Sequence, residues 1–220
     1  MTFTDWGLID YKEAWDRQRA IAEQVLAEKQ RPKATAQQVI LCEHPHVYTL
    51  GRHGKINNLL VNERFLSDIN ATYYHVDRGG DITYHGPGQI VGYPILDLER
   101  LRLGLKQYIF NLEEIIIHTL KDWAITAGRL QGATGVWVAA DTAQARKICA
   151  IGVRASRFVT THGFALNVNT DLSYYRHINP CGFVDKGVTS MQQEFGKQVD
   201  IEEVKERLKK YFLLWINLTL

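Results

Sequence analysis

The spacing of apolar and polar residues separates three helices from a set of short strands. Over residues 11–30 apolar side chains recur every three or four positions among charges, which predicts an amphipathic helix with one face on the core. A second helix is predicted over residues 105–127, which are rich in Leu and Ile with interspersed charges. Asp200 is a good N-cap, and a third helix is predicted from it to about Leu214.

Short apolar runs between these helices predict strands. They cover residues 38–43, 47–49, 73–76, 90–96, 135–139, 146–154 and 160–168, and a turn around Ala140 and Asp141 joins two of them in a hairpin. Strands mixed with a few long helices indicate an α/β or α+β fold. We find no repeat and no linker, so residues 1–220 are expected to form a single domain.

Composition narrows the class of protein. The 220 residues carry a net charge of +2, and a general nucleic-acid binder would show a stronger basic excess. No apolar run approaches the roughly 20 residues that a membrane-spanning helix needs, and the first residues lack a signal-peptide pattern. The three cysteines are an odd number and do not suggest a disulfide framework. A cytoplasmic enzyme with reduced thiols is therefore expected.

Cys181 differs from the other two cysteines in its neighbours. It lies in Asn-Pro-Cys-Gly, a turn-forming sequence that can present a thiol to a ligand, whereas Cys42 and Cys149 lie in apolar runs. An isolated cysteine is more often a small buried hydrophobe, so the context carries the functional interpretation. A free thiol has a pKa of about 8.5, and a nearby cation would raise the thiolate fraction. His177 and Lys147 are candidate cations, although spacing alone does not favour Lys147 over a solvated strand end.

A glycine-dense polar segment, Arg-Gly-Gly-Asp-Ile-Thr-Tyr-His-Gly-Pro-Gly-Gln, covers residues 78–89. Its glycines let the backbone approach a ligand closely, and free N–H groups in such a loop can bind an oxygen that becomes negative. Tyr84 and His85 would add donors. The segment matches neither the P-loop nor the dinucleotide fingerprint, and an ordinary long turn is the alternative.

Other histidines give weaker signals. His162 lies beside a strand-like run, where a lone histidine is more often structural than functional. His44, His46 and His53 could suggest a metal, but they lack the spacing of known ligand sets, and no metal site is expected.

Four ordered motifs resemble the lipoyl(octanoyl) transferases. They are the segment 78–89, Lys-Ile-Cys-Ala-Ile-Gly at 147–152, His-Gly-Phe-Ala-Leu-Asn-Val-Asn at 162–169, and Ile-Asn-Pro-Cys-Gly at 178–182. The resemblance extends from about His44 to about Met191. Asp81 departs from the neutral polar residue that the family often has there.

The resemblance implies a fold and a set of roles. The fold would be that of the biotin and lipoate ligase catalytic domains, a mixed sheet with a smaller second sheet and flanking helices. Cys181 would be the nucleophile and Lys147 the residue that lowers its pKa and relays a proton. Substrate would be bound by Arg78, Gly79, Gly80, Asp81, Ile82, Thr83, Tyr84, His85, Ala150, Ile151, Gly152, Gly163, Phe164 and Ala165. Val91 and Ile95 could line an acyl tunnel with Phe164.

The implied reaction moves an octanoyl group from acyl carrier protein through a Cys181 thioester to a lysine of a lipoyl domain. The acceptors would be 2-oxoacid dehydrogenase complexes and the glycine cleavage H protein, with no cofactor, no ATP and no nucleic-acid or membrane partner. Arg154 and Arg157 could dock the acidic carrier. The alternatives are an ATP-dependent lipoate or biotin ligase, which needs no cysteine, a non-catalytic carrier-binding module, and a papain-like thiol hydrolase.

Overall fold

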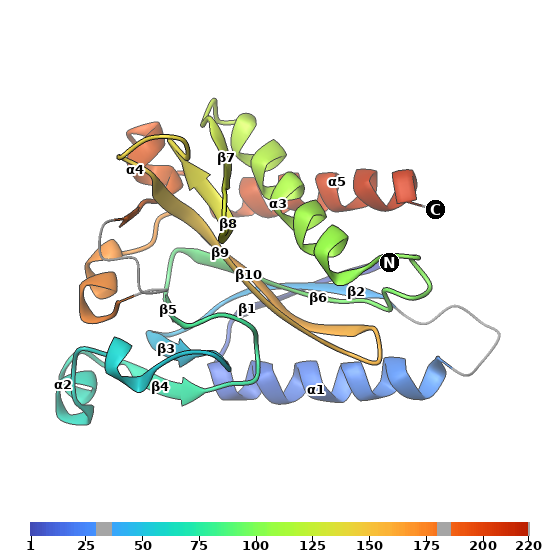
Figure 1. Ribbon diagram of the computed structural model, residues 1–220, viewed down its shortest axis with the longest axis horizontal. Helices are drawn as coiled ribbons and strands as arrows, with labels where there is room; N and C mark the ends of the chain where they lie inside the picture. The colour runs from blue at the N-terminus through green and yellow to red at the C-terminus, as the bar shows by residue number, and fades with distance from the viewer. Residues whose placement is uncertain (30–36, 180–185, 220) are drawn as a thin grey trace.

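Two β-sheets of unequal size form the framework of the molecule (Figure 1). The computed structural model describes residues 1–29, 37–179 and 186–219. The large sheet has the strand order β1-β2-β6-β10-β9-β8-β7, with β11 paired to β9, and the small sheet has the order β4-β3-β5. The β1–β2, β9–β11 and β3–β4 pairs are parallel and the other pairs antiparallel, so both sheets are mixed.

The strands of the large sheet are β1 (Thr2–Leu8), β2 (Gln38–Glu43), β6 (Gln89–Ile95), β7 (Ala127–Leu130), β8 (Ala133–Val138), β9 (Arg146–Ser156), β10 (Val159–Asn167) and β11 (Gly187–Val188). The small sheet consists of β3 (Val47–Leu50), β4 (Thr72–His75) and β5 (Ile82–His85). The α-helices are α1 (Tyr11–Glu28), α2 (Glu63–Asp68), α3 (Leu105–Lys121), α4 (Met191–Phe195) and α5 (Ile201–Thr219), with 3₁₀ turns η1 (Ile56–Asn58) and η2 (Leu172–His177). None of these described helices is long and apolar enough to cross a bilayer.

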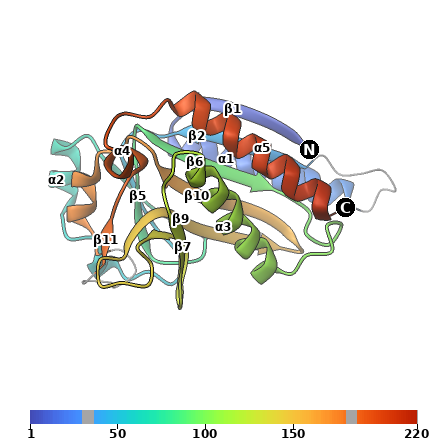
Figure 2. The ribbon, with the colours of Figure 1, turned by 90° about the horizontal axis from the view of Figure 1, so that it is seen from above.

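Helices cover the two faces of the large sheet unequally. α3 and α5 lie over one face and α1 lies under the other (Figures 1 and 2). Leu112 and Ile116 of α3 and Phe212 of α5 pack on one face in the largest apolar cluster. Ala14 and Val25 of α1 pack on the opposite face. Because apolar residues alternate along β2, β6 and β10, each strand contributes to both clusters.

Most predicted elements are confirmed, and two need correction. The helix that begins at Leu105 ends at Lys121, not at 127, because Ala124 adopts a left-handed conformation (φ 55) and the Ile125 N–H donates back to the Leu120 carbonyl. The glycine-dense segment is not wholly a loop, since β5 lies inside it and pairs with β3. Ile82 and Tyr84 alternate with polar residues there and are buried in the small-sheet cluster.

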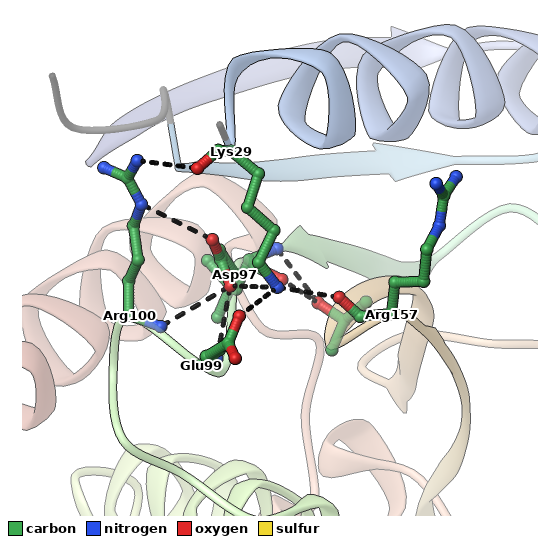
Figure 3. A network of polar contacts seen from close by, with 7 residues as sticks. Lys29, Asp97, Glu99, Arg100 and Arg157 are labelled. Carbon is green, nitrogen blue, oxygen red and sulfur yellow. Dashed lines mark hydrogen bonds and ion pairs between the residues drawn. The ribbon is translucent and has the colours of Figure 1, made fainter. Parts of the chain in front are cut away.

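A polar network connects the C-terminal end of α1 to the segment after β6 and to the β9–β10 turn of the large sheet (Figure 3). Lys29 Nζ lies 3.1 Å from Asp97 Oδ1 and 2.8 Å from Glu99 Oε2, and it donates to the Arg157 carbonyl at 2.8 Å. Arg100 Nε lies 3.5 Å from the other carboxylate oxygen of Asp97, whose side chain is fully buried. We call these five residues the Lys29–Asp97 network. It joins the end of α1, the segment after β6 and the β9–β10 turn.

Candidate active site

A cavity of about 310 Å³ opens between the large sheet and β5. Five of the large-sheet strands, β6, β10, β9, β8 and β11, contribute to its wall, on the side of the sheet that α1 covers. Gly152 and Ala150 of β9 lie directly opposite Gly163 and Ala165 of β10 in the ladder, so these small residues share one face. They leave room for a ligand where larger side chains would fill the space.

A β-bulge directs Lys147 into this cavity. Cys149 pairs with Val136, but Lys147 pairs with Trp137, the next residue along β8, so β9 has one extra residue, Ile148. With strict alternation Lys147 would face away from Ala150. The inserted residue reverses that orientation, and both Lys147 and Ala150 line the cavity.

Arg78 holds the glycine-dense segment against the small sheet. Its guanidinium is buried and Nη2 donates to the Thr49 carbonyl at 2.6 Å and to Thr49 Oγ1 at 2.9 Å. A Cβ on Gly152 would lie 2.9 Å from the Gly79 carbonyl oxygen. Glycine is therefore required at 152 for the segment to approach β9, which explains the small residue on this strand.

Tyr84 and His85 do not supply donors to a ligand. The Tyr84 hydroxyl contacts His46 Nδ1 at 2.8 Å, and Tyr84 does not line the cavity. His85 Nδ1 lies 2.8 Å from Gln89 Oε1, which can only accept, so that nitrogen carries the proton and Nε2 accepts from Thr49 Oγ1. Burial places the pKa of His85 well below its usual value, so the ring is a neutral wall.

Of the substrate-binding residues implied by the resemblance, all but two line the cavity. The lining set is Arg78, Gly80, Asp81, Ile82, Thr83, His85, Ala150, Ile151, Gly152, Gly163, Phe164 and Ala165, together with Lys147. Gly79 and Tyr84 do not line it. Val91 lines it as expected, but Ile95 packs in the α1 cluster.

The described cysteines are structural. Cys42 and Cys149 are fully buried, and burial raises the pKa of both thiols. Cys181 lies outside the described residues. The chain before that gap is fastened at Asn179, whose N–H donates to the Asn58 carbonyl at 2.8 Å. After the gap, Val188 of β11 pairs with Lys147.

His162 lines the cavity, although its position beside a strand favours a structural role. Its backbone is left-handed (φ 57), and its Nε2 lies 2.9 Å from Asp77 Oδ1. Burial lowers the pKa of His162, so the neutral ring donates its Nε2 proton to the carboxylate. That hydrogen bond, aided by Arg154, lowers the pKa of Asp77 to about 2. Arg154 is thus engaged within the protein.

Further lining residues carry no motif. They include Tyr11, Tyr93, Trp137 and Tyr175. Tyr11 begins α1 and stacks on His85 with ring centroids 5.7 Å apart, a contact between residues far apart in the chain that no local pattern signals. Trp137 follows the apolar pattern of β8 and is indistinguishable in sequence from a core residue.

The histidines near the N-terminus hold hydrogen bonds. His44 Nδ1 contacts the Ile9 carbonyl at 2.7 Å and Nε2 contacts the Tyr93 hydroxyl at 2.7 Å. Among the described residues, no group of three or more His, Cys, Asp or Glu side chains could hold a metal ion.

Comparison with known proteins agrees with this architecture. An octanoyltransferase of Bacteroides fragilis is 59% identical over 96% of this chain and 95% of its own length. An octanoyltransferase of Parabacteroides distasonis is 53% identical over 96% of each chain. A bipartite lipoate protein ligase of Thermoplasma acidophilum shares the fold, with a TM-score of 0.69 at 12% identity over 96% of this chain and 81% of that chain.

A family model for the lipoyl protein ligase A/B catalytic domain matches residues 10–213, nearly the whole chain. A biotin protein ligase of Aquifex aeolicus has the same fold at a TM-score of 0.52 and 13% identity, over 98% of this chain and 69% of that chain. The resemblance noted from the four motifs and the predicted fold class are thereby confirmed. The chain belongs to the lipoyl protein ligase A/B catalytic-domain family.

Proposed function

We propose that this protein is an octanoyltransferase that modifies lipoyl domains, with octanoyl-acyl carrier protein as the donor. The observation that carries the proposal is the cavity, in which Lys147 shares one wall with the small residues of β9 and β10. Relatives at 53–59% identity that bear the name octanoyltransferase support the choice of acyl group. The acceptors would be the lipoyl domains of 2-oxoacid dehydrogenase complexes and the glycine cleavage H protein.

The reaction would proceed in two acyl transfers. The Cys181 thiolate, favoured by the Lys147 ammonium, attacks the thioester carbonyl of the donor. The tetrahedral oxyanion collapses and expels the carrier thiolate, which takes a proton from the Lys147 ammonium, while the octanoyl group stays on Cys181.

In the second transfer the neutral amine of the acceptor lysine attacks the Cys181 thioester. The Cys181 thiolate leaves, and the amine proton passes to Lys147, which is neutral after the first transfer and becomes an ammonium again. Exchange of one thioester for another is nearly balanced and conversion of a thioester to an amide is downhill, so no ATP is consumed. The apolar part of the cavity, which includes Val91 and Phe164, would receive the acyl tail.

Intact-protein mass spectrometry tests the proposal. Wild type and Cys181→Ala are mixed with octanoyl-acyl carrier protein in the absence of ATP, with Cys42→Ala as the matched control for a buried thiol. We expect a hydroxylamine-labile octanoyl adduct on wild type and on Cys42→Ala, and none on Cys181→Ala. The adduct should disappear when a lipoyl domain is added, and the domain should gain one octanoyl group.

The opposite outcome has a specific meaning. If no adduct forms, and the lipoyl domain is modified only by free octanoate with ATP, the protein is a ligase and Cys181 has no covalent role. Structural neighbours that are ligases share the fold and do not decide between these reactions.

A further inference from the structure

The side chain of Lys147 ends over the face of a buried aromatic ring. Its Nζ lies 4.7 Å from the centroid of the Trp137 ring, and Trp137 is only 2% exposed. Both residues line the cavity. A cation at this distance from an indole face is attracted by the ring quadrupole, most strongly where water is excluded.

We propose that Trp137 is the positioning residue of Lys147: its indole face holds the ammonium form of the lysine at the cavity wall. The inference rests on the proposed function, since it assigns Trp137 a part in the acyl transfer from the donor. A lysine held in its charged form favours a neighbouring thiolate over a thiol. Trp137 itself would act on the reaction only through Lys147.

The ring has a fixed orientation. Its Nε1–H donates to the Ala133 carbonyl at 3.0 Å, and Ala133 and Ala145 pack against it in a small apolar cluster. Because the indole has one polar hydrogen and that hydrogen is used, the ring meets the lysine through its π face. Because the ring is already fixed, no further side-chain freedom of Trp137 is lost when the ammonium packs on it.

The backbone of Lys147 is held from two sides. It pairs with Trp137 of β8 across the bulge and with Val188 of β11 on the other edge of β9. In addition, the Thr189 N–H donates to the Lys147 carbonyl at 2.9 Å. The bulge and the two ladders therefore fix the point from which the side chain departs.

The ionised groups on the neighbouring elements are mostly paired. On β9, Arg146 is bridged to Glu194 of α4. On α3, the Glu113 carboxylate accepts from Gly135 N–H and is bridged to Arg129. The described strands β8 and β11 carry no titratable side chain.

Other titratable groups line the same cavity. The charged ones are Arg78, Asp81 and Lys186. The imidazoles of His85 and His162 have lowered pKa values because they are buried, and are neutral. Burial raises the pKa of the three phenols, which are Tyr11, Tyr93 and Tyr175. These groups are the same in wild type and in the Trp137 variants, so their effects on the titration of Lys147 cancel when the variants are compared.

Titration of Lys147 tests the proposal directly. Protein with ¹³C at lysine Cε is titrated by NMR, and the Lys147 resonance is assigned through Lys147→Arg. We expect the titration midpoint to fall by up to about one pH unit in Trp137→Leu and by less in Trp137→Phe, which keeps a π face. Trp6→Leu is the control, because Trp6 contacts Arg17 outside the cavity and should leave Lys147 unchanged.

The rate of Cys181 acylation by octanoyl-acyl carrier protein, followed across the alkaline range, gives the second readout. The alkaline limb of this pH–rate profile should move to lower pH together with the Lys147 midpoint. The shift should again be larger in Trp137→Leu than in Trp137→Phe. An unchanged midpoint and an unchanged limb in folded Trp137→Leu would overturn the proposal. If wild type itself forms no adduct, the proposed function fails, while the NMR titration still decides the role of Trp137.

Fluorinated tryptophan covers the case in which Trp137→Leu does not fold. Fluorine weakens the ring quadrupole and leaves the shape of the indole almost unchanged. The Lys147 midpoint should fall stepwise as fluorine atoms are added in wild type, and should not respond in Trp137→Phe. A midpoint that responds equally in the two backgrounds would contradict the proposal.

Discussion

Three buried histidines lie in the cavity wall or directly behind it as neutral rings, and each has a defined hydrogen-bonding role. His44, His85 and His162 are buried, and desolvation is the largest cause of the lowered pKa in each. His44 is the clearest case: the Ile9 carbonyl can only accept, so Nδ1 carries the proton and Nε2 accepts from the Tyr93 hydroxyl. The tautomer of His44 thus orients a residue that lines the cavity.

This arrangement predicts acid sensitivity. Burial lowers the pKa of His44 to about 4, and an unfolded histidine titrates near 6.5, so the unfolded chain binds the proton first as pH falls. The contribution of neutral His44 to the free energy of unfolding is therefore fully present above about pH 6.5. It is lost as the pH falls, by about 3 kcal/mol at pH 4. Urea unfolding across this range should show a smaller decline in His44→Gln than in wild type.

The exposed His75→Gln serves as the control and should decline with the wild-type slope. A wild-type slope in His44→Gln would show that protonation of the other buried groups accounts for the acid sensitivity.

At the scale of single residues, the sequence predicts site residues correctly where they lie in a recognisable motif. Arg78, Lys147 and Gly163 were identified through ordered motifs, and they do line the cavity. It failed for Tyr11 and Trp137, because an aromatic residue that follows an apolar pattern has the same local signal in a core and in a cavity wall. The role assigned to His85 was wrong for a related reason, since its hydrogen-bond partners Thr49 and Gln89 are set by tertiary packing.

At the scale of elements, the β8–β9 pair is the most constrained part of the site. Gly135 has a left-handed backbone (φ 118), and a Cβ there would lie 2.5 Å from the Cys149 carbonyl oxygen. Cys149 borders the bulge that directs Lys147. A side chain at 135 would therefore displace the strand at the point where the lysine is aimed.

We expect Gly135→Ala to lower the free energy of unfolding by about 2 kcal/mol and to reduce octanoyl transfer more than tenfold. Gly128→Ala on β7 is the matched control, because nothing lies within 4 Å of its added Cβ and its φ is not left-handed. Denaturant unfolding and a transfer assay measure the two effects. Equal stability and activity in the two variants would show that the bulge tolerates a shift of β8.

Helices and strands with a regular spacing of apolar residues are predicted well. An element whose conformation depends on pairing with another strand is not. α1 and β2 were predicted almost to the residue because the spacing of their apolar residues is regular. β5 was missed because glycines flank it on both sides, and its strand conformation comes from pairing with β3. The end of α3 was missed because no glycine marks it; Ala124 adopts the left-handed conformation instead.

At the scale of the whole molecule, the Lys29–Asp97 network ties three distant segments together. The Asp97 side chain is fully buried, and that of Lys29 is 17% exposed. Removal of one partner from a buried pair leaves an incompletely compensated charge. The Arg100 guanidinium and the Glu99 N–H still contact the carboxylate in such a variant and limit the loss.

We expect Lys29→Met to lower the free energy of unfolding by about 2 kcal/mol. Its effect should be smaller in an Asp97→Asn background, with a coupling energy of about 1 kcal/mol in a double-mutant cycle followed by urea unfolding. Lys12→Met removes a surface pair with Asp16 and should change stability by less than about 0.5 kcal/mol. Equal losses in the Lys12 and Lys29 variants would mean that the network contributes no more than a surface pair.

The first strand of the chain depends on its last helix. Phe3 of β1 meets Phe212 of α5 with ring centroids 6.2 Å apart, and Asp5 is bridged to Lys205 at 2.7 Å. During synthesis on the ribosome, β1 and β2 therefore emerge long before the helix that covers them. The nascent chain therefore exposes apolar sheet surface for most of its translation. Because of this order of assembly, we expect chaperones to bind unfinished chains, and chains whose translation stalls to aggregate.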